Sequence, residues 1–206
     1  MKFAISQMVD PGAGLLDRIR TLSERSFHAP PWSTVGIEPC CIDEMLRLPS
    51  SFLFVAWHRE SWQLAGFSIG VVLSPISRNF LGLRFDTEPS LRQPLPMDGD
   101  YHLTWRAVEP RYRGFGVGQS LTQVRIQAAR NLRCSNVFGE TILSNHGTAM
   151  MHHHMDFEVY HRSQHCGCRG IYERLFFRKR LSSIHATRCF SRKVDSNLQT
   201  VTSRES

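Results

Sequence analysis

The chain has 206 residues, of which 41% are hydrophobic and 21% charged, and these values are typical of one globular domain with or without a tail. No apolar run approaches the roughly 20 residues that a membrane-spanning helix needs, so no membrane segment is expected. The net charge of +7 would favour phosphate groups. The basic residues are spread along the chain without interleaved aromatic residues, however, and dedicated nucleic-acid binding is not indicated.

The N-terminal residues and the cysteines predict the compartment. Residues 1–7 lack the apolar core of a secretory signal, which predicts a cytoplasmic location. Six cysteines in a chain without an export signal are expected to be reduced thiols rather than a disulfide framework.

Apolar periodicity and turn residues predict the following elements in the first half of the chain. They are a strand at 3–8, a helix after Asp10-Pro11-Gly12, a proline-rich loop at 28–35, a short helix at about 42–48, and a hairpin of strands at 52–58 and 63–73.

The second half begins with residues 74–100, which hold four prolines and little periodicity. This pattern predicts a connection without regular elements that could cover a substrate. Beyond it we expect a strand at 101–108, a helix at 118–131, a strand at 135–143, a helix at about 145–155, and strands near 157–161 and 172–180.

The stretch from Thr104 to Gly118 joins a predicted strand to a predicted helix through a proline, a basic turn and three alternate glycines. Glycines let the backbone approach a ligand closely, and the first turn of a helix offers unpaired N–H groups to an anion. The joint therefore indicates a pyrophosphate cradle, although glycines at such joints also occur in plain tight turns. A dinucleotide fold would place the motif after the first strand, whereas here it lies past the middle of the chain.

The same segment resembles motif A of the GNAT superfamily of N-acetyltransferases, which bind acetyl-CoA. The pattern Arg/Gln-x-x-Gly-x-Gly/Ala is met by Arg113, Gly116 and Gly118, with Val108 and Pro110 ahead of it. The resemblance implies that the backbone amides from Arg113 to Gly118, continuing into Gln119 and Ser120, hold the CoA pyrophosphate, and that the end of the preceding strand pairs with the pantetheine arm. The residues that it implies for cofactor binding are Ala107, Val108, Arg113, Gly114, Phe115, Gly116, Val117, Gly118, Gln119, Ser120 and Asn145.

The segment from residue 140 to Phe157 resembles motif B of the same superfamily. Asn145 suits a helix N-cap and a contact to the cofactor arm. His152 stands where the family commonly has the tyrosine that protonates the CoA thiolate, and Asp156 stands where it commonly has glycine. Histidine can donate a proton near neutral pH, so the resemblance implies a general acid at His152, with a surface histidine as the alternative.

Glu140 precedes Asn145 by five residues, where the ribosomal-protein alanine acetyltransferases of this superfamily carry a glutamate proposed as general base. A carboxylate here could take the proton of an ammonium nucleophile directly or through water. Glu140 is our preferred base, an ordinary charged strand residue is the alternative, and His102 and Glu109 are the other candidates.

Three further features of the sequence lead to predictions. Trp32 occupies the region that lines the acceptor site in this superfamily and is predicted to bind the substrate, with a packed loop residue as the alternative. The methionines at 150, 151 and 155 have helical spacing and are expected in the core. The histidines and cysteines at 152–168 lack the spacing of a zinc site, so no metal is expected.

Together these features predict an α/β (α+β) GNAT domain over residues 1–180, with a mixed, mostly antiparallel, V-shaped sheet flanked by helices, and a disordered polar tail over 181–206. The expected function is acetyl-CoA-dependent acetylation of a primary amine by direct attack, without a metal. The alternative is a non-catalytic acetyl-CoA-binding sensor or interaction module, motivated by the missing tyrosine. The sequence leaves open the oligomeric state, a homodimer included, and the acceptor, whether protein N-terminus, polyamine, antibiotic or small metabolite.

Overall fold

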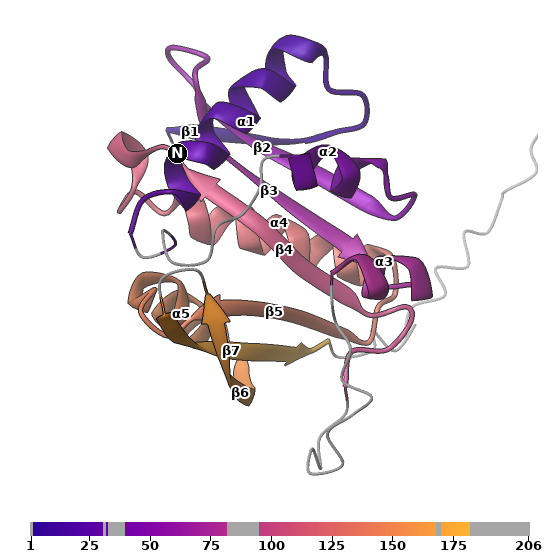
Figure 1. Ribbon diagram of the computed structural model, residues 1–206. Coiled ribbons are helices and arrows are strands. Elements are labelled where there is room, and N and C mark those ends of the chain that lie inside the picture. The colour runs from indigo at the N-terminus through magenta and orange to yellow at the C-terminus, as the bar shows by residue number, and fades with distance from the viewer. Residues whose placement is uncertain (1, 31, 33–39, 82–94, 168–169, 182–206) are drawn as a thin grey trace, which may run out of the picture.

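The computed structural model describes residues 2–30, 32, 40–81, 95–167 and 170–181. These residues form a seven-stranded sheet flanked by helices (Figure 1), which confirms the predicted mixed, mostly antiparallel α/β fold. In chain order the elements are β1 (Phe3–Met8), α1 (Ala13–Phe27), α2 (Cys40–Arg47), β2 (Ser51–His58), β3 (Leu64–Val72), α3 (Pro75–Phe80), β4 (Tyr101–Val108), a 3-10 turn (Pro110–Tyr112), α4 (Val117–Asn131), β5 (Asn136–Ile142), α5 (His146–His154), β6 (Glu158–Gly167) and β7 (Gly170–Arg180).

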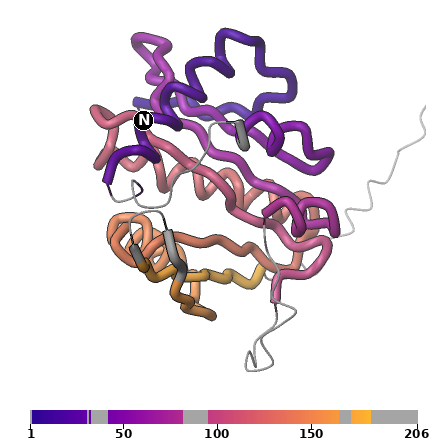
Figure 2. Tube along the Cα trace, viewed as in Figure 1, coloured from indigo at the N-terminus to yellow at the C-terminus, as the bar shows by residue number. Residues whose placement is uncertain are grey.

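The strand order is β1-β2-β3-β4-β5-β7-β6, and every neighbouring pair is antiparallel except β4 and β5. The N-terminal strands fill one half of the sheet and the C-terminal strands the other (Figure 2), so the β4–β5 joint lies between the halves. Its parallel register covers only Tyr101 to Leu103 opposite Val137 to Gly139. The carboxyl ends of the two strands diverge beyond these pairs (Figure 1), and this divergence gives the sheet its V shape.

A β-bulge marks the point where β4 leaves β5. Thr104 and Trp105 of β4 together oppose the single residue Ile69 of β3. The Ile69 carbonyl accepts hydrogen bonds from the Thr104 hydroxyl at 2.8 Å and from the Arg125 guanidinium at 3.1 Å. Because a bulge bends its strand and re-aims its side chains, it brings polar groups to the divergence.

The alternating side chains of β2 show which helices cover each face of the sheet. Leu53 and Val55 pack in one buried cluster with α1 and α2, whereas Phe54 and Ala56 pack in another with α4. Since successive strand residues point to opposite faces, α1 and α2 cover one face and α4 covers the other (Figure 1). None of the helices in the described part of the chain combines the length and apolar character needed to cross a membrane.

Helix α3 corrects the expectation that residues 74–100 lack regular structure. The hydroxyl of Ser74 accepts from the Ser77 amide, and the Ser77 hydroxyl accepts from the Ser74 amide, with Pro75 in the first helical position. This capping box starts a helix of only six residues, which is too short to show apolar periodicity. The prediction that this connection covers a substrate depends largely on 82–94, which lie outside the described residues.

The expectation that Met150, Met151 and Met155 lie in the core is correct only in part, because Met155 packs against a buried cluster whereas Met150 does not. Met151 lies against Arg106, with its sulfur 2.9 Å from Nη1, because that side of the helix faces β4 and α4. Met150 is 60% exposed, because the adjacent position on the helix points away from this contact. The predicted tail lies almost wholly outside the described residues, and its first residue, Leu181, belongs to the core.

Candidate functional site

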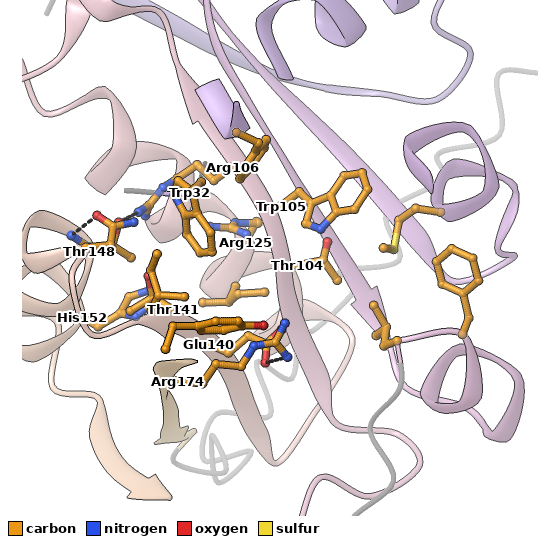
Figure 3. Close-up of a pocket in the computed structure, with 18 of the residues that line it drawn as sticks. Trp32, Thr104, Trp105, Arg106, Arg125, Glu140, Thr141, Thr148, His152 and Arg174 are labelled. Carbon is orange, nitrogen blue, oxygen red and sulfur yellow. Dashed lines mark hydrogen bonds and ion pairs between the residues drawn. The ribbon is translucent and has the colours of Figure 1, made fainter. Parts of the chain in front are cut away.

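A cavity of about 620 Å³ occupies the joint where β4 and β5 part (Figure 3). One wall is apolar and comes from α1 to α3 and the bulge of β4. The other wall is polar and comes from β4, β5, β7, α4 and α5. The apolar wall includes Phe27, Trp32, Met45, Phe80 and Trp105, and the polar wall includes Arg106, Arg125, Glu140, Thr141, His152 and Arg174.

A second cavity, of about 380 Å³, lies beside the glycine-rich joint. Its lining includes most of the residues predicted to bind the cofactor, namely Ala107, Val108, Arg113, Gly114, Gly116, Val117, Gly118, Gln119 and Asn145. Trp32, Arg106, Asn145 and Thr148 line both cavities, so the two adjoin. Within the described residues, Phe115 and Ser120 line neither, and Phe115 is 63% exposed.

The backbone of the joint has the geometry of an anion cradle. Gly114 and Gly116 have φ values of +80° and +79°, a left-handed conformation that favours glycine, and a Cβ added to either would meet nothing within 4 Å. The first intrahelical bond of α4 runs from the Ser120 amide to the Gly116 carbonyl at 2.9 Å. The amides of the three residues before Ser120 therefore point out of the helix end, where they and the helix dipole favour an anion. The amide of Ser120 is engaged in that bond, and the amide of Arg113 donates to the Pro110 carbonyl.

Asn145 and Trp32 fix the borders of the two cavities. Asn145 is the N-cap of α5, and its side chain accepts from the Thr148 amide at 3.4 Å. The Trp32 ring packs edge-on against Phe27, with 5.6 Å between the ring centroids. Both residues therefore sit where the two cavities meet, which is the position expected of groups that contact a cofactor arm and an acceptor.

Glu140 extends from β5 into the first cavity. Its carboxylate lies 3.3 Å from Nη1 of Arg174 on the neighbouring strand β7 (Figure 3), and its side chain is 28% exposed. Burial raises the pKa of Glu140, and the charge of Arg174 opposes this rise. The site thus holds a carboxylate that is more basic than an ordinary glutamate, as a general base requires.

His152 is a core residue of α5, so the alternative of a surface histidine is wrong. It is 3% exposed, and its ring packs against Phe157 and Phe177 at centroid distances of 5.0 and 4.7 Å. Burial lowers the pKa of His152 well below its ordinary value, and the charges of Arg106 and Arg125 lower it further. The imidazole is therefore neutral at pH 7, a state that can donate a hydrogen bond but holds no extra proton to transfer.

Arg106 and Arg125 are site residues that the sequence analysis missed. Arg106 donates to the hydroxyls of Thr122 at 2.7 Å and Thr148 at 3.0 Å, and Arg125 donates to the hydroxyl of Thr122 at 3.2 Å. Burial lowers the pKa of Arg106 to about 10 and, with the charge of Arg106, that of Arg125 to about 9. One signal was available for Arg125, because its spacing of four from Leu121 places it on the buried face of the predicted helix.

The two other base candidates lie outside both cavities. Glu109 pairs with Arg25 at 2.7 Å. His102 is 4% exposed, and its Nδ1 has no hydrogen-bond partner among the described residues. Burial, with the charge of Arg125, lowers the pKa of His102 to about 4, so this side chain is neutral in the folded protein.

The burial of His102 predicts acid sensitivity. In the unfolded chain His102 binds a proton near its ordinary pKa of 6.5, whereas in the folded chain it does so only near a pKa of about 4. The folded state therefore loses stability as the pH falls from about 6.5 to about 4. The loss from this residue should reach about 3 kcal/mol. Chemical denaturation at pH 7 and pH 4 should therefore show a smaller loss for His102→Leu than for the wild type. Equal losses in the two proteins would contradict the prediction, since the contribution of His152 is common to both.

A metal was not expected, and the residues described by the structure contain no group of three or more His, Cys, Asp or Glu side chains that could hold one. Cys134 is a buried free thiol.

The parted parallel strands, the glycine cradle and the adjoining cleft define the acetyltransferase class of proteins. A model of the acetyltransferase (GNAT) family matches residues 16–157, and the chain belongs to this family. No curated protein sequence matches the chain significantly.

Solved structures show the same fold. The ribosomal-protein-S18-alanine N-acetyltransferase of Escherichia coli is 16% identical with a TM-score of 0.64, and the match covers 91% of this chain and 99% of that one. The ribosomal-protein-alanine N-acetyltransferase of Brucella melitensis is 17% identical with a TM-score of 0.62, covering 86% and 99%. NAA60 of Arabidopsis thaliana, crystallised with acetyl-CoA, is 14% identical with a TM-score of 0.63, covering 87% and 98%.

Proposed function

We propose that the protein is an N-acetyltransferase that moves the acetyl group of acetyl-CoA to a primary amine by direct attack. The observation that carries this proposal is the adjacency of two cavities. One contains an open glycine cradle at the start of α4, and the other contains the basic carboxylate of Glu140. The first suits a pyrophosphate and the second suits an ammonium group that must lose a proton before it attacks.

Each residue then has a role. The amides of Val117, Gly118 and Gln119 hold the pyrophosphate, and the end of β4 at Ala107 and Val108 orients the pantetheine arm along the divergence. The donor supplies an activated acetyl thioester. Glu140 takes a proton from the acceptor amine, whose lone pair then attacks the thioester carbonyl carbon. The carbon–sulfur bond then breaks, and CoA leaves with the electron pair on its sulfur. No covalent intermediate with the protein is required.

The acceptor side favours an amine next to an apolar group. The apolar wall is formed by rings such as Trp32 and Trp105, and the carboxylates of Glu44 and Glu140 also line this cavity. An ammonium group would lie at the carboxylates and an apolar side chain against the rings. A protein N-terminus meets this description, and two structural neighbours are named for acetylation of ribosomal-protein alanine. The cytoplasmic location and a homodimer remain predictions.

The cradle is tested by calorimetric titration of acetyl-CoA into the wild type and two glutamate variants. Gly118→Glu places a carboxylate in the first turn of α4, where the backbone is helical and an added Cβ comes no closer than 3.6 Å to another group. Gly14→Glu makes the same change at the same position of α1, in open space. Repulsion between the new carboxylate and the pyrophosphate should weaken binding by about tenfold or more in Gly118→Glu.

Gly14→Glu is expected to bind acetyl-CoA as the wild type does, because no residue in the first turn of α1 lines either of the two cavities. Failure of the folded wild type to bind acetyl-CoA would reject the proposal. Binding without release of CoA thiol, across a panel of amines and N-terminal peptides, would instead support the non-catalytic sensor.

A further inference from the structure

Two of the three arginines in the polar wall of the first cavity have no anionic partner among the described residues. None of the ion pairs formed by the described residues includes Arg106 or Arg125. Their hydrogen bonds go to neutral oxygens and a thioether, although Arg125 is only 2% exposed. A buried guanidinium normally has a charged partner, because its desolvation is costly.

Two polar atoms without hydrogen-bond partners belong to residues that line the same cavity. The Thr141 hydroxyl and Nδ1 of His152 are buried, and neither has a hydrogen-bond partner among the described residues. The two residues are 1% and 3% exposed, and both line the cavity (Figure 3). Buried polar groups without partners are uncommon and indicate a missing ligand or water.

Helix α5 connects Arg106 to His152. Arg106 Nη2 donates to Thr148, which precedes His152 by four residues and so shares its face of the helix. Met151 also contacts the Arg106 guanidinium. Arg106, Thr141 and His152 therefore all line the cavity where β4 and β5 part, and Arg106 also lines the adjoining cavity beside the glycine cradle.

We infer that Arg106, with Thr141 and His152 as neutral donors, forms a site for a sulfur anion that holds the departing CoA thiolate. This inference rests on the proposed function and replaces proton donation at the leaving group with charge stabilisation. The carbon–sulfur bond breaks, its electron pair stays on sulfur, and CoA leaves as a thiolate beside the Arg106 guanidinium. The amine loses one proton to Glu140 before attack and a second to solvent afterwards, so the step balances without an acid.

The test is the ionisation of bound CoA, which does not depend on turnover. The ultraviolet absorbance of the thiolate is titrated with pH for CoA in complex with the protein, and the complex with CoA lacking its sulfur is subtracted. An opposite charge at contact distance should lower the pKa of the thiol by about 1–2 units relative to free CoA. The charged and titratable groups that face this part of the cavity are Arg106, Arg125, Glu44, Glu140, His152, Tyr172 and Arg174.

Variants test whether Arg106 causes the lowered pKa of the bound CoA thiol. Arg106→Met should abolish the shift, Arg106→Lys should retain part of it, and Arg106→Gln gives a second neutral variant if methionine disturbs folding, as checked by circular dichroism. Arg178→Met is the matched control. Arg178 is also buried, at 2% exposure, but it pairs with Glu158 and lies outside the cavity. This control should leave the shift unchanged.

The outcomes separate the inference from the proposed function. CoA binding with an unshifted thiol pKa in the wild type would overturn the inference and leave the transferase intact. A shift that survives in both neutral Arg106 variants would also overturn it. Failure of the wild type to bind CoA would reject the proposed function and this inference together.

Discussion

Replacing Glu140 by glutamine is expected to lower kcat/KM by about 10²–10⁴-fold, which is the usual contribution of a general base. Glutamine keeps the size of the side chain and a hydrogen-bond acceptor but cannot take a proton. The loss should appear with any acceptor whose amine is protonated at the assay pH. It is measured as initial rates of CoA release under conditions where acetyl-CoA binding, followed by calorimetry, is unchanged.

The pH profile distinguishes a base from a positioning group. Burial raises the pKa of Glu140, so wild-type activity should be lost as the pH falls through this raised value. Arg174→Met removes the charge that opposes the rise, so the acid limb should move to higher pH. Arg162→Met is the control, because Arg162 pairs instead with Glu173 at 3.7 Å and is 63% exposed. An acid limb that stays in place in Arg174→Met would assign the base to another group.

Gly70→Ala is expected to destabilise the fold by about 2–3 kcal/mol through overpacking. Gly70 on β3 faces the ring of Tyr101 on β4, and an added Cβ would lie 2.5 Å from ring carbon Cε1 and nearer still to the hydroxyl oxygen. The ring cannot move aside freely, because Tyr101 is fully buried. Denaturant unfolding monitored by circular dichroism gives the free energy of unfolding.

A double-mutant cycle tests whether the destabilisation by Gly70→Ala comes from overpacking against Tyr101. The Tyr101 hydroxyl has no hydrogen-bond partner among the described residues, so Tyr101→Phe alone should cost little or be stabilising. In the Gly70→Ala background it removes the atom closest to the new methyl and should recover at least about 0.5 kcal/mol. Gly147→Ala is the control, since an added Cβ there meets nothing within 4 Å and the helix favours alanine. A purely additive cycle would mean that the loss does not come from the Tyr101 contact.

Features that depend on neighbours in sequence were predictable. The glycine joint ahead of α4 and the Asn145 cap of α5 are set by backbone conformation and by hydrogen bonds spanning a few residues. The cap of α3 is equally local, but the helix that it starts is too short to give a periodic signal. The family motifs then supplied the prediction of a mixed, V-shaped sheet, which periodicity alone does not give.

The sequence by itself therefore predicted the fold class, through the family motifs, and the glycine-rich joint between β4 and α4, through a short-range pattern. The tertiary structure decided the electrostatics of the cleft. Whether His152 is a surface histidine or a buried neutral one depends on Phe177, 25 positions further along the chain. The hydrogen bond from Arg125 to the carbonyl of Ile69, the β3 residue opposite the bulge, spans 56 positions. Charge and pKa depend on the distance and burial of groups brought together by folding, and no local pattern encodes them.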